Sequence, residues 1–125
     1  MHNQRVAFYS HDTMGMGHLR RNLLIAGSIA DHPVRAEILM ISGATETAGF
    51  AERAGLDCVT LPALSKDLQG QYSAKRFRWS LERIIQFRAR LIHAAVECFQ
   101  PDVFIVDKVP RGISNELDLT LRQLR

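Results

Sequence analysis

The sequence predicts an α/β protein: a doubly wound parallel sheet between two layers of helices. Two observations lead to this fold class. Four short segments rich in strand-forming residues alternate with segments of helical periodicity along the 125 residues. The second of these segments, "AEILMIS" at 36–42, is almost continuously apolar, as in strands that are covered on both faces. Such strands are joined by helical crossovers, so we expect one three-layer α/β/α domain over residues 1–125.

A polar loop separates the first predicted strand from the first predicted helix. "RVAFYS" at 5–10 is rich in strand formers and ends where the glycine-containing loop begins. Apolar residues then recur at helical spacing over 19–30, and this stripe stops before Pro33. The second strand, at 36–42, ends at Gly43.

The middle of the chain is predicted to form a short helix and a third strand. The helix covers "TETAGFAERAG" at 45–55, with Thr45 or Thr47 as its N-cap and Gly55 at its carboxyl end. The strand is "DCVTLP" at 57–62, and its proline stops it.

The last part of the chain begins with a polar stretch at 63–75, which we expect to be an irregular, mobile loop. The longest helix follows at 76–99, where apolar residues recur at helical spacing with arginines between most of them. "DVFIVD" at 102–107 is the fourth predicted strand. A turn at 108–115 and a helix at 116–125 complete the prediction.

The loop "SHDTMGMGHLRRN" at 10–22 is the strongest candidate for a binding site. Ligands of open parallel sheets bind outside the carboxyl ends of the strands, and this loop follows the first strand. Gly15 and Gly17 permit positive φ angles and a close backbone approach. The amino end of the next helix offers free N–H groups and a partial positive charge. Together these features favour a phosphate or a developing oxyanion.

Several other site types are disfavoured. A dinucleotide fingerprint needs a third glycine where Arg20 stands and an acid where the chain reads Ser42-Gly43, and no P-loop is present, which argues against NAD and ATP. Cys58 and Cys98 lack ligand spacing, so we expect neither a metal nor another cofactor. The net charge of +3 is too small to indicate a nucleic-acid partner.

His18 and Arg21 are the candidate chemical groups of this loop. The helix amino end opposes protonation of His18, and a neutral imidazole acts as a general base toward a hydroxyl or a water. The alternative is that His18 only caps the helix. Arg21, about one turn later, either clamps an anion or remains a solvated first-turn arginine.

Three segments of the chain together carry a family resemblance. They are the motif GxGHxxR at 15–21, "ILMISG" at 38–43 and "PDVFIVDKVPRG" at 101–112. In this combination the chain resembles the amino-terminal domain of GT-B nucleotide-sugar glycosyltransferases. The similar proteins are the peptidoglycan lipid-intermediate N-acetylglucosaminyltransferase and a set of predicted bacterial glycosyltransferases.

The resemblance implies that this chain is a Rossmann-like domain, one half of a GT-B fold, and that it binds the acceptor. A carboxyl-terminal domain, absent from these 125 residues, would hold most of a nucleotide-sugar donor, UDP-linked by analogy, and the isolated domain should catalyse little. His18 would be the base that deprotonates the acceptor hydroxyl. The expected substrate-binding residues are Gly15, Met16, Gly17, Arg21, Asp107 and Lys108. The alternative for Asp107 and Lys108 is that they form an ion pair at the end of the strand and bind no substrate.

Two other functions remain open: a GT-B-like nucleotide-sugar hydrolase, in which His18 activates water, and a non-catalytic binding module that needs a partner domain.

The segment 76–79 contains Phe77 and Trp79 next to Arg76 and Arg78. These residues form a basic aromatic surface for a lipid-linked acceptor or for weak membrane contact. The alternative is that the aromatic residues belong to the core and the arginines are solvated. The sequence leaves a homodimer open. It contains no signal-peptide pattern and no apolar run near the roughly 20 residues of a membrane span, so we expect a cytoplasmic protein.

Overall fold

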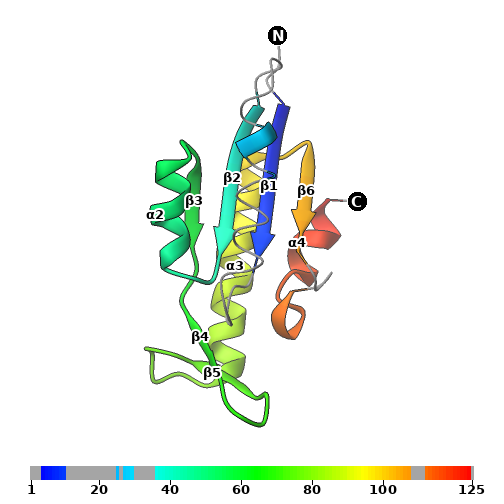
Figure 1. Ribbon diagram of the computed structural model, residues 1–125. Coiled ribbons are helices and arrows are strands. Elements are labelled where there is room, and N and C mark those ends of the chain that lie inside the picture. The colour runs from blue at the N-terminus through cyan, green and yellow to red at the C-terminus, as the bar shows by residue number, and fades with distance from the viewer. Residues whose placement is uncertain (1–3, 11–24, 26, 30–35, 108–111, 125) are drawn as a thin grey trace.

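The computed structural model describes residues 4–10, 25, 27–29, 36–107 and 112–124, and its centre is a four-stranded parallel sheet (Figure 1). The strands, in spatial order, are β3 (Asp57–Thr60), β2 (Ala36–Ser42), β1 (Gln4–Ser10) and β6 (Val103–Val106). Each neighbouring pair is parallel. Helices flank the sheet, so the predicted α/β class with a parallel sheet is confirmed.

The register aligns the carboxyl ends of the four strands along one edge of the sheet. β1 pairs with β2 over its whole length, from Gln4 opposite Ala36 to Ser10 opposite Ser42. Ser42 in turn lies opposite Thr60 of β3, and Tyr9 lies opposite Val106 of β6. Residues that follow these strands therefore leave the sheet side by side.

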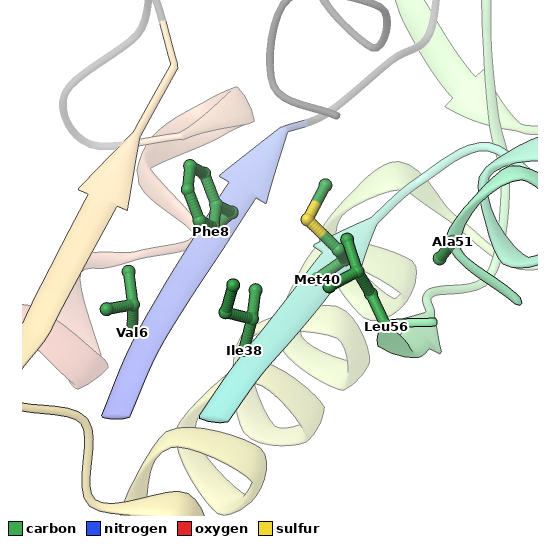
Figure 2. Packing of buried hydrophobic residues seen from close by; sticks show 6 residues of the cluster. All are labelled: Val6, Phe8, Ile38, Met40, Ala51 and Leu56. Carbon is green, nitrogen blue, oxygen red and sulfur yellow. The ribbon is translucent and has the colours of Figure 1, made fainter. Parts of the chain in front are cut away.

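Successive residues of β1 serve two different cores, because side chains of a strand point alternately to opposite faces. Phe8 belongs to a cluster with Met40 and with Ala51 of α2 (Glu46–Arg53), which Figure 2 shows between the strands and that helix. Tyr9 belongs to a cluster on the other face. That cluster includes residues of α3 (Leu81–Phe99) and of the segment before α4 (Asp118–Gln123). The sheet is thus covered on both faces, as its apolar strands require.

The helix α3 begins five residues later than its apolar spacing predicts. Ser80 is its N-cap: its backbone is extended, with φ −62° and ψ 156°, and its side chain accepts a hydrogen bond from the Arg83 backbone N–H at 3.2 Å. The prediction of helix over 76–80 is therefore wrong. At the other end, Gln100 adopts a left-handed conformation with φ 52°, and Pro101 follows, so the predicted end at residue 99 is confirmed.

The helix α2 ends as predicted but begins without the predicted cap. Gly55 follows it with φ +76°. Thr45 occupies the N-cap position, but its side chain makes no capping hydrogen bond. Thr47 is buried inside the first turn, where its hydroxyl lies 2.7 Å from the Ser42 hydroxyl.

The polar stretch at 63–75 is not irregular, and this prediction is also wrong. It forms an antiparallel hairpin of β4 (Leu64–Lys66) and β5 (Tyr72–Ala74), which lies beyond the carboxyl edge of the main sheet in Figure 1. The turn is closed by the Asp67 side chain, which accepts backbone hydrogen bonds of 2.9 and 2.8 Å. Gly70 adopts φ +82° in this turn.

The end of the chain contains a 3₁₀ helix, η1 (Ile113–Asn115), inside the predicted turn. The predicted helix at 116–125 is shorter than expected and corresponds to α4 (Asp118–Gln123). The first predicted helix, at 19–30, lies largely outside the described residues, but residues 25 and 27–29 are helical. None of the described helices combines the length and apolar character that a membrane span needs.

Candidate functional site

The candidate site lies at the carboxyl edge of the sheet, between β1 and β6. The chain places β2 on one side of β1 and returns through α3 to place β6 on the other side. The strand order therefore reverses at β1, and in open parallel sheets ligands bind outside the strand ends at such a point. Asp107 follows β6 at this point, and its backbone N–H donates to the Tyr9 carbonyl oxygen at 3.0 Å. Asp107 therefore lies at this edge, beside the end of β1.

The other predicted site residues lie outside the described part of the chain. They are Gly15, Met16, Gly17, His18, Arg21 and Lys108. The structure describes the strand that leads to the glycine loop as far as Ser10, which is buried. It also describes the strand that leads to Lys108. The sheet therefore brings the starting points of both predicted binding segments together.

The end of β2 is occupied by its own turn. The Ala44 backbone N–H donates to the Ser42 hydroxyl at 3.0 Å, and the Gly43 N–H donates to the Ser10 carbonyl at 3.3 Å. In a dinucleotide-binding fold a carboxylate at the end of this strand binds the ribose, but the chain has Ser42 and Gly43 there. Within the described ranges, no three His, Cys, Asp or Glu side chains gather in a way that would hold a metal ion.

A cavity of about 420 Å³ opens at the same edge, beside the ends of β2 and β3. Its lining is formed by Thr45, Thr60, Leu61, Pro62, Ala63, Arg76, Phe77, Phe87 and Leu91. Most of these residues are apolar, and Arg76 is the charged residue among them. Phe77 is 46 % exposed, so an aromatic face is presented to solvent next to a positive charge.

The aromatic segment before α3 combines the two alternatives that its sequence left open. Phe77 and Trp79 stack with ring centroids 4.7 Å apart, and Trp79 packs partly against a buried cluster that contains Ile84. The guanidinium of Arg83 lies 3.8 Å from the centroid of the Trp79 ring. Phe77 is thus a surface residue, whereas Trp79 is partly buried in the core. A cation–π contact joins Arg83 to Trp79.

A buried polar cluster lies under this edge, and sequence reasoning did not find it. Arg88 of α3 is 0 % exposed and Glu116 is 1 % exposed. Arg88 Nε donates to Glu116 Oε2 at 2.7 Å, and Arg88 Nη2 donates to Oε1 at 2.9 Å. The third donor, Nη1, reaches the Pro62 carbonyl at 2.6 Å. The Tyr9 hydroxyl, also buried, donates to Glu116 Oε1.

The protonation of the cluster follows from its burial. Burial raises the pKa of Tyr9 well above its ordinary range, and the adjacent Glu116 carboxylate raises it further. Burial alone would lower the pKa of Arg88, but the hydrogen bonds and charge of Glu116 outweigh it and raise that pKa. We therefore describe the cluster as a neutral phenol that donates to a buried guanidinium–carboxylate pair.

No family model matches this chain, and no curated protein or solved structure matches it. The function is therefore argued from the residues and geometry of the site.

Proposed function

We propose that this chain is the acceptor-binding domain of a GT-B nucleotide-sugar glycosyltransferase. In this proposal His18 is the general base, and Gly15, Met16, Gly17, Arg21, Asp107 and Lys108 line the binding crevice. A second domain would hold most of the UDP-linked donor. The observation that carries the proposal is the arrangement of β1 and β6, which brings the start of the glycine loop and Asp107 to one edge of the sheet.

The strand order supports a Rossmann-like form of the fold. The order β3-β2-β1-β6 corresponds to 3-2-1-4 when the parallel strands are numbered along the chain, which is how the doubly wound dinucleotide fold begins. In that fold, ligands bind at the divergence point beside the first strand. The glycine loop follows that strand directly.

The proposed chemistry is a displacement at the anomeric carbon of the donor sugar. His18 takes the proton of the acceptor hydroxyl while the oxygen forms the new glycosidic bond. The bond to the nucleoside diphosphate breaks, and the diphosphate leaves with the electron pair. The amino end of the helix that the sequence predicts after the glycine loop would favour the negative charge that develops on the leaving group.

The cavity supports an acceptor that joins an apolar group to an anion. Its lining is mainly aliphatic and aromatic, and it includes Arg76, whose guanidinium pairs well with a phosphate. A lipid-linked phosphate combines both features in one molecule. Arg76 and Phe77 are the residues that should recognise the two parts.

The test is ligand binding to the chain, measured by thermal shift and calorimetry with geranyl phosphate, geraniol, UDP and a UDP-sugar. Geranyl phosphate at ten times its Kd should stabilise the protein by about 1.4 kcal/mol and raise the melting midpoint by roughly 4 °C. Geraniol should do less, because it lacks the anion. UDP should give a weak response or none, since donor binding is assigned to a second domain.

Variants sharpen the test. Arg76→Ala should remove the difference between geranyl phosphate and geraniol, and Phe77→Ala should weaken both. Arg90→Ala is the matched control, because Arg90 is exposed on α3 and does not line the cavity. Submicromolar binding of UDP to this chain would contradict the assignment of donor binding to a second domain. Any sugar transfer that the chain supports must fall to the uncatalysed level in His18→Ala, and release of free sugar without acceptor would favour a hydrolase.

A further inference from the structure

The buried cluster of Tyr9, Arg88 and Glu116 is not explained by its contribution to stability. Removing a guanidinium and a carboxylate from water costs free energy that their attraction repays only in part. Apolar side chains of similar volume commonly stabilise a core as well as a buried ion pair does. What the pair provides, and apolar side chains do not, is a set of hydrogen bonds with fixed directions.

These hydrogen bonds join four separate parts of the chain. Tyr9 belongs to β1 and Arg88 to α3, while Glu116 lies between η1 and α4. The fourth part is the connection after β3, whose Pro62 carbonyl accepts from Arg88. The planar guanidinium donates two side-by-side bonds to Glu116 and a third to the Pro62 carbonyl, so it fixes α3 relative to both of those segments.

The packing of Gly112 shows how closely the segment that contains Glu116 approaches β1. Gly112 has φ +75°, and a Cβ built on it would lie 3.0 Å from the Tyr9 hydroxyl oxygen and 2.9 Å from Leu117 Cγ. Only a residue without a side chain fits this position unstrained. The segment that begins at Gly112 therefore packs directly against the Tyr9 hydroxyl of the cluster.

The cluster also touches the candidate site at two places. Pro62 lines the cavity, and so do Phe87 and Leu91, which lie beside Arg88 on α3. At the strand edge, the carbonyl of Tyr9 accepts the Asp107 N–H, while its hydroxyl holds Glu116. The cluster is thus joined to the cavity wall through Pro62 and to the end of β1 through Tyr9.

We propose that Tyr9, Arg88 and Glu116 are positioning residues, which hold the cavity wall at Pro62 and the segment 112–117 in fixed geometry at the end of β1. The effect of this geometry on ligand binding rests on the proposed function. The positioning of the two segments by the cluster does not rest on it, so the positioning is tested first on the protein without ligand.

The experiment is amide hydrogen exchange of the full chain, read at residues 61–64, residues 112–117 and β2. Tyr9→Phe removes one hydrogen bond to Glu116, so exchange at 112–117 should become about tenfold faster while 61–64 stays unchanged. Arg88→Lys replaces the guanidinium fork with a single ammonium, and exchange should rise at both segments. In β2 neither variant should change the exchange rates by a comparable factor.

Two matched variants serve as controls. Tyr72→Phe removes the other tyrosine hydroxyl of the chain, and Arg90→Lys makes the same arginine change on the exposed side of α3. Neither should alter exchange at 61–64 or 112–117. A uniform rise of exchange throughout the sheet, or unchanged exchange at 112–117 in Tyr9→Phe, would overturn the proposal.

The affinity for geranyl phosphate then connects the cluster to the site. It should fall severalfold in Arg88→Lys, which loosens the cavity wall, and less in Tyr9→Phe, which leaves the Pro62 contact in place. If the unaltered chain does not bind geranyl phosphate, the proposed function fails, while the exchange pattern still decides whether the cluster positions these segments.

Discussion

Replacing Arg88 by methionine is the most informative single perturbation of the fold. The change retains an unbranched apolar stem but removes the guanidinium and with it three hydrogen bonds of 2.6 to 2.9 Å. It leaves the Glu116 carboxylate buried with no cation and one donor, the Tyr9 hydroxyl. Breaking a buried pair in this way costs about 3–5 kcal/mol, a large part of the roughly 5–15 kcal/mol that stabilises a typical domain.

A double-mutant cycle separates the charge from the packing. Glu116→Gln has almost the same shape, and its amide oxygen still accepts from Tyr9. The double variant Arg88→Met/Glu116→Gln therefore has no uncompensated charge, and its loss of stability should be smaller than the sum of the two single losses by about 2 kcal/mol, within the usual range of coupling energies for contacting residues.

Urea unfolding measures the cycle. The signals are far-ultraviolet circular dichroism and the fluorescence of Trp79, the one tryptophan of the chain. Arg90→Met, on the exposed side of α3, should change the free energy of unfolding by about 0.5 kcal/mol or less. If the double variant loses the sum of the two single losses, Arg88 acts through its aliphatic stem alone and the reasoning is refuted.

Three further predictions concern pH, a glycine and a helix cap. Burial raises the pKa of Tyr9 above its ordinary value of 10.0, so the folded state holds that proton more tightly than the unfolded state. Stability should therefore be complete below about pH 10 and fall by up to about 1.4 kcal/mol per pH unit above it, a slope that urea unfolding detects and that Tyr9→Phe removes. Gly112→Ala, with φ +75° and a leucine carbon 2.9 Å from the new Cβ, should cost about 2–3 kcal/mol in urea unfolding, whereas Gly55→Ala, with φ +76° in open space, should cost about 1 kcal/mol. Ser80→Ala removes a capping hydrogen bond and should lower the free energy of unfolding by about 1 kcal/mol, whereas Thr45→Ala, at a cap position without such a bond, should change it less.

The strands of the main sheet were predictable because their signal is local. The second strand was predicted at 36–42 and is observed as Ala36–Ser42, and the other three differ by one or two residues at their ends. A short apolar run bounded by glycine, proline or polar residues specifies such a strand without reference to the rest of the chain. The end of the fourth strand is located in the same way, which is why Asp107 was expected at a strand end and follows β6 directly.

The hairpin and the start of α3 were missed because their signals are short or compete with each other. β4 and β5 have three residues each, too few for an alternating pattern to stand out from a polar loop. Phe77 extends the apolar spacing of α3 beyond its real start. Ser80 stops the helix there, because its side chain bonds the free N–H of Arg83 only when its own backbone is extended.

The buried pair could not be predicted from the sequence, because a charged residue is buried only when its partner is. Arg88 and Glu116 are 28 residues apart, and no local pattern links them. In the sequence, Arg88 is one of several arginines between the apolar residues of a long helix, and such residues are ordinarily solvated. Only the packing of α3 on the sheet distinguishes it from its exposed neighbours.

The two parts of the proposed site therefore depend on different kinds of information. Asp107 and the start of the glycine loop are adjacent because β1 and β6 are neighbouring parallel strands, whose carboxyl ends lie at one edge of the sheet. The cavity is formed by residues that follow β2 and β3 together with residues before and within α3, so it exists only while α3 is held in place against the connection after β3. The bond from Arg88 to the Pro62 carbonyl joins those two segments directly. A substitution at Arg88 should therefore alter the cavity as well as the stability, and a binding defect larger than the loss of folded protein would identify that bond as the reason.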